Sequence, residues 1–440
     1  MLFLSLDFGT SSIKGVIADE KGNILNSSKA EYPYQLLPGE KVELKDSDFK
    51  GALKKITSAF DSDLLDKVEV LCYDTFSPSP VFLDDSGNLV CDNIITHLDR
   101  RSRSYSKTVD DVFGNQNYKN ITGILPFAGG CSLMTLLWFK DNAPDVMKKA
   151  RHIGHLPTYV HYLFTKKWAV DLVNASMLGV YETTSQGGWS GDIIKAFGLP
   201  SECFDEIVEP GRPFGTLTKE AADFLGLKQG ITVTMGTNDM AAAQEGALNN
   251  RAGLALNSAG SSDMISILTD KPVTDDNYYL RNAARKGLWQ IYATTAGGFA
   301  VDWFYKEFCR DLSKKEYYRL IDESLDKELV IDEVFTPYLT GDRQSLEKKT
   351  ASINGLTLAS TREKILVAML KSIQGVLYET IQRAAKFEKI DSVIKVTGGM
   401  VTDSYIKLKE ISMPGYSFKR VDDCTVRGNV LMSVSGLTDQ

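Results

Sequence analysis

The chain has 440 residues, 43% hydrophobic residues, 24% charged residues and a formal net charge of −7. Its length exceeds a comfortable single hydrophobic core, so we expect two domains. The acidic balance argues against nucleic acid or an anionic membrane as the main partner, although it allows a small anionic ligand. Six scattered cysteines with no C-x-x-C pair suggest neither a disulfide framework nor a zinc cage. Without a basic leader or an apolar run of about 18 residues, we expect a cytoplasmic chain with no membrane contact.

The opening segment, residues 2–34, predicts three strands, and the first of them ends on a carboxylate, Asp7. The turn that follows consists of small residues: Gly9, Thr10, Ser11 and Ser12. Such a turn can aim backbone N–H groups and hydroxyls at a phosphate chain, and Asp7 could hold a hard cation such as Mg²⁺. An ordinary β-hairpin is the alternative at this point.

The middle of the chain alternates between helical and strand patterns. Residues 46–60 have helical spacing, residues 68–73 predict a buried strand, residues 81–90 predict a hairpin, and residues 132–188 predict mostly helix. A further strand leads to Asp239, which begins an Ala-rich helix. A carboxylate is favourable at a helix start, so a plain capping role is one interpretation of Asp239.

The second half of the chain repeats the plan of the opening segment. Residues 254–268 contain an apolar strand, a Gly/Ser turn and a departing apolar strand. This repeat suggests a structural duplication whose halves face each other across a cleft, with a boundary near residue 244. A third glycine turn, at Gly398 and Gly399, ends a strand near the C-terminus.

These three turns, in this order, resemble those of the sugar-kinase, Hsp70 and actin ATPase fold. The residues between them resemble the FGGY family of carbohydrate kinases, and the resemblance covers nearly the whole chain. It rests on segments in matching order: Leu6–Lys14, Pro38–Glu43, His97–Arg101, Asp171–Ser176, Gly236–Asp239, Ala259–Ser262, Gly298 with Asp302 and Trp303, and Thr397–Gly399.

The resemblance implies an α/β protein of two ribonuclease H-like (actin-like ATPase) domains, each a mixed sheet flanked by helices, with an interdomain cleft. Residues 1–243 would form the N-terminal FGGY domain, with the first phosphate turn, the sugar pocket and the catalytic aspartate. Residues 244–440 would form the C-terminal FGGY domain, with the second phosphate turn and the adenosine site.

The resemblance also implies an ATP-dependent sugar kinase that works with Mg²⁺. Asp239 would be the general base, the two phosphate turns would grip the phosphates from opposite sides, and Asp7 and Asp239 would face the metal. A P-loop motif is absent from the sequence. The implied nucleotide-binding residues are Asp7, Gly9, Thr10, Ser11, Ser12, Lys14, Gly260, Ser261, Ser262, Gly298, Asp302, Gly398, Gly399 and Asp403.

The implied sugar pocket departs most from the family pattern. Its candidate residues are Thr75, Phe76, Ser77, Pro78, His97, Asp99 and Asn238. His97 stands where the family usually has Trp, and Pro78 where gluconate-kinase-like members have His. Asp99 and Arg101 either contact the substrate or form an internal ion pair.

The sequence therefore leaves two functional hypotheses from different classes open. The first is a kinase of a ketose such as xylulose, or of gluconate or another polyol or sugar acid. The second is a non-catalytic ATP-binding protein, either a kinase-like sensor or a conformational binder of the Hsp70 or actin type. The resemblance leaves a homodimer open as the assembly.

Overall fold

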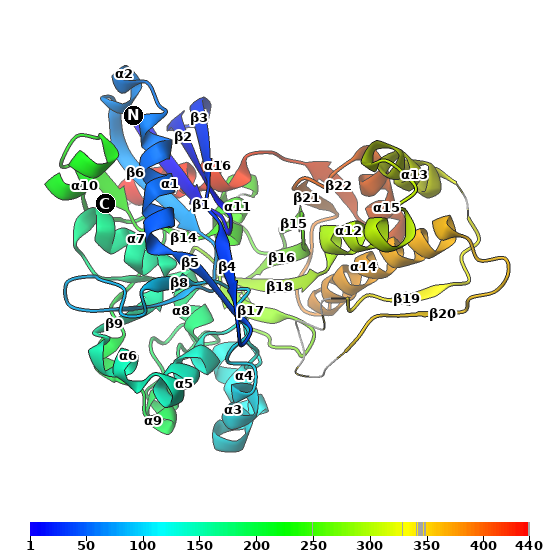
Figure 1. The fold of residues 1–440 in the computed structure, drawn as a ribbon, viewed down its shortest axis with the longest axis horizontal. Coiled ribbons are helices and arrows are strands. Elements are labelled where there is room, and N and C mark those ends of the chain that lie inside the picture. Colours follow the sequence, from blue (N-terminus) through cyan, green and yellow to red (C-terminus); the bar gives the residue numbers. More distant parts are fainter. Residues whose placement is uncertain (249, 328, 340, 342–345, 347–348, 439–440) are drawn as a thin grey trace.

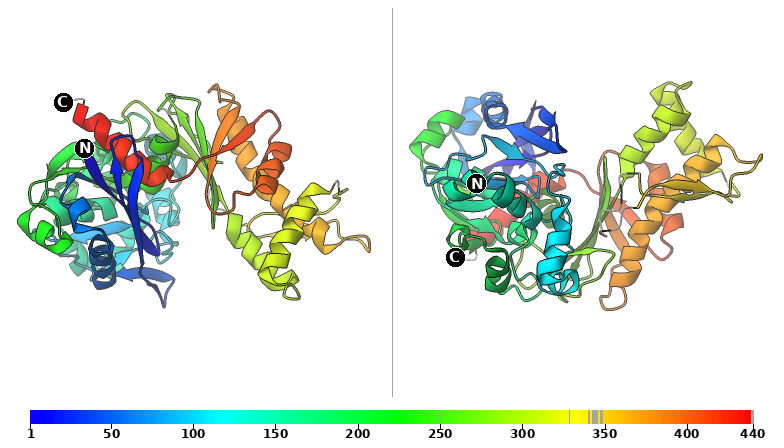
Figure 2. Two further views of the ribbon diagram at one scale, coloured as in Figure 1. Left: turned by 90° about the horizontal axis from the view of Figure 1, so that it is seen from above. Right: turned by 60° about the horizontal axis from the view of Figure 1, so that its bottom comes forward.

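The computed structural model describes residues 1–248, 250–327, 329–339, 341, 346 and 349–438. The chain forms two α/β lobes side by side, with the N-terminal half in one lobe and most of the C-terminal half in the other (Figure 1). Two further views show the last helix returning to the first lobe (Figure 2).

The central sheet of the N-terminal lobe has seven strands: β1 (Leu2–Phe8), β2 (Ser12–Asp19), β3 (Ile24–Glu31), β6 (Val68–Thr75), β12 (Pro213–Thr216), β13 (Thr232–Thr234) and β14 (Thr237–Asn238). Their order is β12-β13-β6-β1-β2-β3, and β14 also pairs with β6. Strand β1 is antiparallel to β2 and parallel to β6. Its apolar run is buried on both faces, because Leu4 and Leu6 join one hydrophobic cluster and Phe3 joins another.

The central sheet of the C-terminal lobe has six strands: β15 (Ala255–Ala259), β16 (Asp263–Thr269), β17 (Tyr279–Asn282), β18 (Trp289–Thr295), β21 (Val393–Thr397) and β22 (Ser417–Arg420). Their order is β17-β18-β16-β15-β21-β22. Strand β15 is antiparallel to β16 and parallel to β21, which repeats the arrangement of β1 with β2 and β6. The strand–turn–strand repeat seen in the sequence is therefore a repeat of topology.

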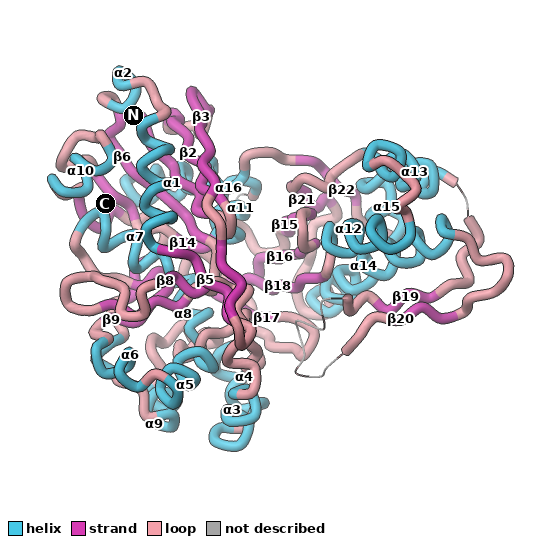
Figure 3. The backbone as a smooth tube through the Cα atoms, in the orientation of Figure 1, coloured by secondary structure: helices cyan, strands magenta, loops and turns pink. Residues whose placement is uncertain are grey.

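Helices lie against both faces of the N-terminal sheet, and the helices of the C-terminal lobe lie on the side of its sheet that is turned away from the N-terminal lobe (Figure 3). Those of the N-terminal half are α1 (Asp46–Ser58), α2 (Ser62–Leu65), α3 (Tyr105–Phe113), α4 (Asn115–Thr122), α5 (Leu133–Asn142), α6 (Pro144–Lys149), α7 (Leu156–Thr165), α8 (Leu172–Leu178), α9 (Gly191–Phe197), α10 (Lys219–Leu225) and α11 (Asp239–Ala247). Those of the C-terminal half are α12 (Gly297–Phe308), α13 (Lys314–Asp326), α14 (Arg362–Ala384), α15 (Asp403–Ser412) and α16 (Cys424–Thr438).

Small strand groups complete the fold: β4 (Tyr34–Leu37), β5 (Lys41–Lys45) and β8 (Asn93–Ile95); β7 (Pro80–Leu83) and β9 (His152–His155); β10 (Val170–Asp171) and β11 (Ile207–Val208); β19 (Val334–Thr336) and β20 (Ser352–Asn354). The hairpin predicted at 81–90 forms, since Leu83 pairs with Leu89 in an antiparallel bridge and the N–H of Val90 donates to the carbonyl of Phe82. Strand β7 also pairs with β9, so the mostly helical segment 132–188 contains a short strand that its pattern did not reveal. That pairing joins segments far apart in the sequence.

Helices α11 and α16 cross at two glycines beside the junction of the lobes. A Cβ atom on Gly428 would lie 1.8 Å from the carbonyl oxygen of Ala242, and one on Gly246 would lie 1.9 Å from that of Cys424. Helix α16 then packs Val430 against the N-terminal sheet. The last helix thus belongs by packing to the first lobe, and the boundary near residue 244 stays a prediction.

Candidate active site

Three aspartates gather at one edge of the N-terminal sheet. The parallel strands β1 and β6 place Asp7 opposite Asp74, and β14, which pairs with β6 at Asp74, leads directly into Asp239. Side chains at the carboxyl ends of parallel strands meet at the same edge of a sheet. The local sequence marked Asp7 as a candidate and the family resemblance marked Asp239, whereas Asp74 joins them only through strand pairing.

Asp7 and Asp74 form a carboxyl pair. Burial raises the pKa of both side chains, that of Asp74 well above its usual range. Repulsion from Asp7 raises the pKa of Asp74 further. Asn429 of α16 donates to Asp74 from the other side, at 2.5 Å. Helix α16 therefore helps to fix the position of the Asp74 carboxyl group.

Asp239 is a half-buried carboxylate that accepts a hydrogen bond from the backbone N–H of Met240, at 2.7 Å, while its neighbour caps α11. The side chain of Asn238 accepts hydrogen bonds from the backbone N–H groups of Met240 and Ala241, at 3.1 and 3.3 Å, and so caps α11. Asn238 also donates to Asp239 Oδ1, at 2.8 Å. Burial, followed by repulsion from Asp7, raises the pKa of Asp239 to about 7. A carboxylate with that pKa can accept a proton near neutral pH.

A cavity of about 250 Å³ lies between the lobes and contains Asp239. The N-terminal half contributes Thr10, Phe76, Ser77, Pro78, His97 and Asn238. The C-terminal half contributes the turn Gly260–Ser262 and residues of its sheet. The structure thus brings together most of the residues predicted for the sugar pocket and both phosphate turns.

A second cavity, of about 500 Å³, lies in the C-terminal lobe and shares Gly260 and Ser261 with the first. Its wall includes Gly298, Asp302 and Gly399, as predicted for the nucleotide. Backbone contacts hold this wall together: the N–H of Gly298 donates to the carbonyl of Gly260, and that of Met400 donates to the carbonyl of Ala259. A ligand spanning both cavities would pass along the turn Gly260–Ser262.

Gly398 is a position where only glycine fits. Its φ is +111°, and a Cβ atom would lie 2.3 Å from the carbonyl oxygen of Ala259. We expect Gly398→Ala to lower the free energy of unfolding by about 1–3 kcal/mol and to weaken nucleotide binding, because it forces the two turns apart. Gly399→Ala is the matched control for stability, since no atom lies within 4 Å of its Cβ position. Equal unfolding midpoints of the two variants would contradict this placement.

Several predicted site residues lie elsewhere. Lys14 pairs with Asp423, at 2.5 Å, on the exposed rim of the site. Thr75 is buried and bonds to the carbonyl of Phe76, outside the cavity wall. Asp403 is exposed in the first turn of α15, next to the cavity residue Thr402. The first turn and the end of the strand before it contain Asp7, Gly9, Ser11 and Ser12, and none of these four lines the cavity between the lobes. Thr10 of the same turn does line it.

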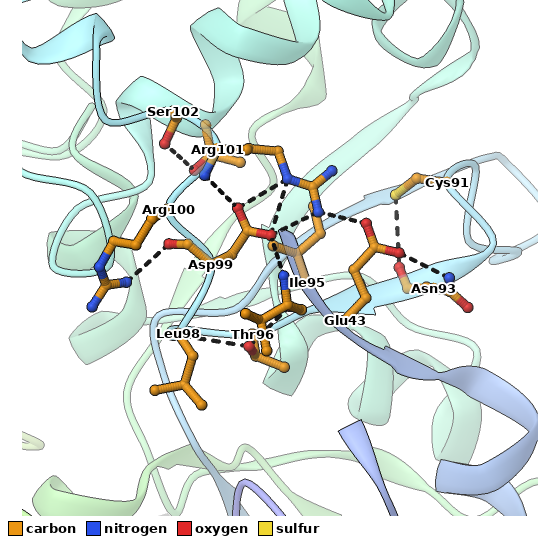
Figure 4. Close-up of polar contacts among 12 residues, drawn as sticks. Glu43, Cys91, Asn93, Ile95, Thr96, Leu98, Asp99, Arg100, Arg101 and Ser102 are labelled. Carbon is orange, nitrogen blue, oxygen red and sulfur yellow. Dashed lines mark hydrogen bonds and ion pairs between the residues drawn. The ribbon is translucent and has the colours of Figure 1, made fainter. Parts of the chain in front are cut away.

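Asp99 belongs to an internal ion-pair cluster (Figure 4). Its carboxylate accepts hydrogen bonds from Arg101 Nε and Nη2, at 2.9 and 2.7 Å, and from the backbone N–H of Val42, at 2.8 Å. Glu43 binds the same guanidinium. Asp99 is 5% exposed and does not line the cavity, whereas His97 does. Of the two predicted roles, the internal ion pair is the one the contacts support.

Replacing Asp99 by Asn should therefore affect stability and not sugar binding. We expect Asp99→Asn to lower the free energy of unfolding by about 1–3 kcal/mol, because a buried charged hydrogen bond to Arg101 is lost. The KM for the sugar should stay within about twofold, since loss of a direct charged contact would raise it roughly tenfold or more. Glu40→Gln, in an exposed ion pair with Arg103, is the control for a surface charge. A tenfold rise in KM with unchanged stability would place Asp99 in the sugar site instead.

Two further features were missed by sequence reasoning. Asp263, directly after the second turn, forms a fully buried ion pair with Lys409, at 2.8 Å. Arg281 enters the cavity between the lobes from β17. Neither lies in a recognisable motif, so only the tertiary structure could reveal them.

The duplicated sheets and the cavity between the lobes define the actin-like ATPase fold, as predicted. The crystal structure of ligand-bound xylulose kinase from Lactobacillus acidophilus matches with a TM-score of 0.89 at 19% identity, covering 100% of this chain and 90% of that one. Gluconate kinase from the same organism matches with a TM-score of 0.88, at 19% identity and the same coverage. These likenesses establish the fold.

The sequence itself establishes the family. The N-terminal domain of the FGGY family of carbohydrate kinases matches residues 2–246. Xylulose kinase from Lactococcus lactis is 26% identical over 412 residues, which cover 90% of this chain and 80% of the relative. Gluconokinase from Bacillus licheniformis is 22% identical over 388 residues, covering 85% and 74%. The chain belongs to the FGGY family of carbohydrate kinases, and it is an ATP-dependent sugar kinase.

The described helices include none that is both long and apolar enough to cross a membrane. Nor do the described residues contain a cluster of three or more His, Cys, Asp or Glu side chains suited to a metal ion. Mg²⁺ in phosphoryl-transfer sites needs no such cluster, because it is held by one or two carboxylates, water and the substrate phosphates. The carboxylates of Asp7 and Asp239 fit that requirement.

Proposed function

We propose that this kinase transfers the γ-phosphate of ATP to a hydroxyl of an open-chain sugar or sugar derivative, with Asp239 as the general base. The observation that carries the proposal is the position of Asp239. It lies in the cavity between the lobes, has a pKa of about 7, and shares that cavity with the turn Gly260–Ser262.

The proposed role of each residue follows from the cavity or turn in which it lies. The cavity of about 500 Å³ binds the adenosine part of ATP, with Gly298, Asp302 and Gly399 in its wall. The turns at residues 9–12 and 260–262 bind the phosphates through backbone N–H groups and hydroxyls. Asp7 and Asp239 would hold Mg²⁺, which supplies charge neutralisation for the phosphates when bound.

Asp239 accepts the proton of the sugar hydroxyl. Asn238 keeps its carboxylate in place by a direct hydrogen bond, and the backbone N–H of Met240 donates to the same oxygen at 2.7 Å. Asp7 keeps a second negative charge close by, which adds to the effect of burial and raises the proton affinity of Asp239. Closure of the lobes around the cavity would exclude water and limit hydrolysis of ATP.

The relatives support two acceptor classes. The similarity to xylulose kinases supports a ketose as the acceptor, and the similarity to the gluconokinase supports a sugar acid. The proposal is tested by measuring ADP formation with xylulose, ribulose, gluconate, glycerol and erythritol, with mass spectrometry of the products. We expect at least one acceptor to stimulate ADP formation and to gain one phosphate. Equal ADP formation with and without every acceptor would favour the ATP-binding sensor.

A further inference from the structure

Arg281 is a buried guanidinium in the wall of the cavity that contains Asp239. The residue is 6% exposed, and its Nε has no hydrogen-bond partner. In the described part of the chain it forms no ion pair, whereas Arg285, four residues later, pairs with Glu245. A buried charge without a partner costs free energy. An unpaired guanidinium in a cavity wall therefore points to a ligand that pairs with it.

Aromatic rings hold Arg281 in place without satisfying its donors. The guanidinium carbon lies 4.5 Å from the ring centre of Tyr292 and 5.3 Å from that of Tyr279. These two rings stack on each other, and Phe127 stacks on Tyr279. Cation–π contacts fix the plane of the guanidinium, but its N–H groups still need acceptors. The group is therefore oriented in advance for an anion.

Asp239 is the one carboxylate in the described wall of the cavity that contains Arg281. The guanidinium lowers the pKa of Asp239, although the described residues show no ion pair between the two. Burial lowers the pKa of His155 to about 3 and raises that of the Cys131 thiol to about 11, so both are neutral at pH 7. The cavity thus offers a cation and a carboxylate at separate places. A molecule with an anionic group and a hydroxyl would match both.

We infer that Arg281 determines substrate specificity, and that the preferred acceptor is a sugar acid whose carboxylate pairs with Arg281 while a hydroxyl faces Asp239. The inference rests on the proposed function and narrows its acceptor. A planar guanidinium binds a carboxylate through two parallel hydrogen bonds, which gives both affinity and a fixed orientation. The apolar residues Phe76, Pro78 and Met264 in the same wall exclude water that would weaken this pair.

The test compares two acceptors that differ only at one end, gluconate and glucitol. We expect wild-type kcat/KM to favour gluconate by about 10- to 100-fold, as for a buried charged hydrogen-bonded pair. Arg281→Gln should raise the KM for gluconate by a similar factor and leave kcat/KM for glucitol within about threefold. Arg281→Lys should keep part of the preference, because it keeps the charge but loses the planar fork. Arg285→Gln, outside both cavities, should keep the full preference.

Other outcomes would overturn the inference. Equal loss of kcat for every acceptor in Arg281→Gln would place the guanidinium on the transferred phosphoryl group. A preference for ribose 5-phosphate over gluconate would make the anion a phosphate. Turnover of xylulose, with gluconate and glucitol indistinguishable, would refute the acid preference while the kinase reaction stands.

Calorimetric titration of gluconate and glucitol without nucleotide tests the inferred acid preference separately from the proposed kinase reaction. If gluconate binds to wild type about tenfold more tightly than glucitol does, and Arg281→Gln loses this difference, the inference holds even where no acceptor is phosphorylated. In that case only the proposed function fails. Equal binding of the two compounds to wild type would contradict the inference. Because this comparison uses the wild-type protein, it remains decisive if Arg281→Gln fails to fold.

Discussion

Asp239→Asn should lower kcat by about 10³-fold while ATP still binds. The amide keeps the size of the carboxyl group and the contact with Asn238 at a similar position, but it cannot accept the proton of the sugar hydroxyl. The second negative charge beside Asp7 is also lost, which removes the electrostatic repulsion in the site. The measurement is the steady-state rate of sugar phosphate formation at saturating ATP and acceptor.

Asp192→Asn is the matched control for this variant. Asp192 also lies in the first turn of a helix, α9, but it is exposed and belongs to neither cavity wall. Its rate should equal that of wild type. ATP affinity, measured by calorimetry, should stay within about threefold in both variants, since neither side chain contacts the adenosine cavity. A kcat for Asp239→Asn within tenfold of wild type would remove Asp239 from the role of general base.

Lys409→Met should lower the free energy of unfolding by about 3–5 kcal/mol, because it leaves the buried carboxylate of Asp263 without its counter-ion. Both side chains are 0% exposed. Tyr405 and Gln374 also donate to Asp263 Oδ2, at 2.8 and 3.1 Å, and Asn257 donates to Oδ1, at 2.7 Å. These neutral donors cannot replace the lost positive charge. Denaturant unfolding of the whole chain measures the effect.

Lys407→Met, on the same helix, is the matched control. Lys407 pairs with Asp326 at the same distance of 2.8 Å, but the two side chains are 51% and 61% exposed. We expect a change of about 0–1 kcal/mol, as for other exposed ion pairs. A loss of stability in Lys409→Met no larger than that in Lys407→Met would contradict the importance of the buried pair.

The buried pair also connects stability with the site. Asp263 directly follows the turn Gly260–Ser262, and Tyr405 of the same network lines the cavity of about 500 Å³. The network therefore holds the turn Gly260–Ser262 against that cavity. Replacing Asp263 and Lys409 together should cost less than the sum of the single changes, because no uncompensated charge remains.

The parts of the site that the sequence could predict are local ones. The two hairpin turns show small residues between apolar strands, and Asp239 stands at a strand–helix boundary, so short segments identify them. The resemblance then supplied the family and the fold. Asn238 shows the limit of a local reading, since the capping pattern could not tell which of two adjacent residues caps α11.

The remaining features depend on contacts between distant segments. Asp74 meets Asp7 through strand pairing, and Asn429 reaches Asp74 from the last helix. Arg281 faces Asp239 only because β17 of the second lobe closes the cavity. Asp99 matched a family segment, yet its carboxylate is used by Arg101 and Val42. A motif identifies which residues are present, and only tertiary packing decides which of them face the substrate.

A single-turnover experiment tests the central proposal most directly. Enzyme in excess over ATP is mixed with a saturating acceptor, and sugar phosphate is quantified over time for wild type and Asp239→Asn. We predict complete transfer in wild type and a transfer step about 10³-fold slower in Asp239→Asn, with equal amounts of ATP bound beforehand. Equal transfer rates in the two proteins, or no sugar phosphate in wild type with any acceptor, would contradict it.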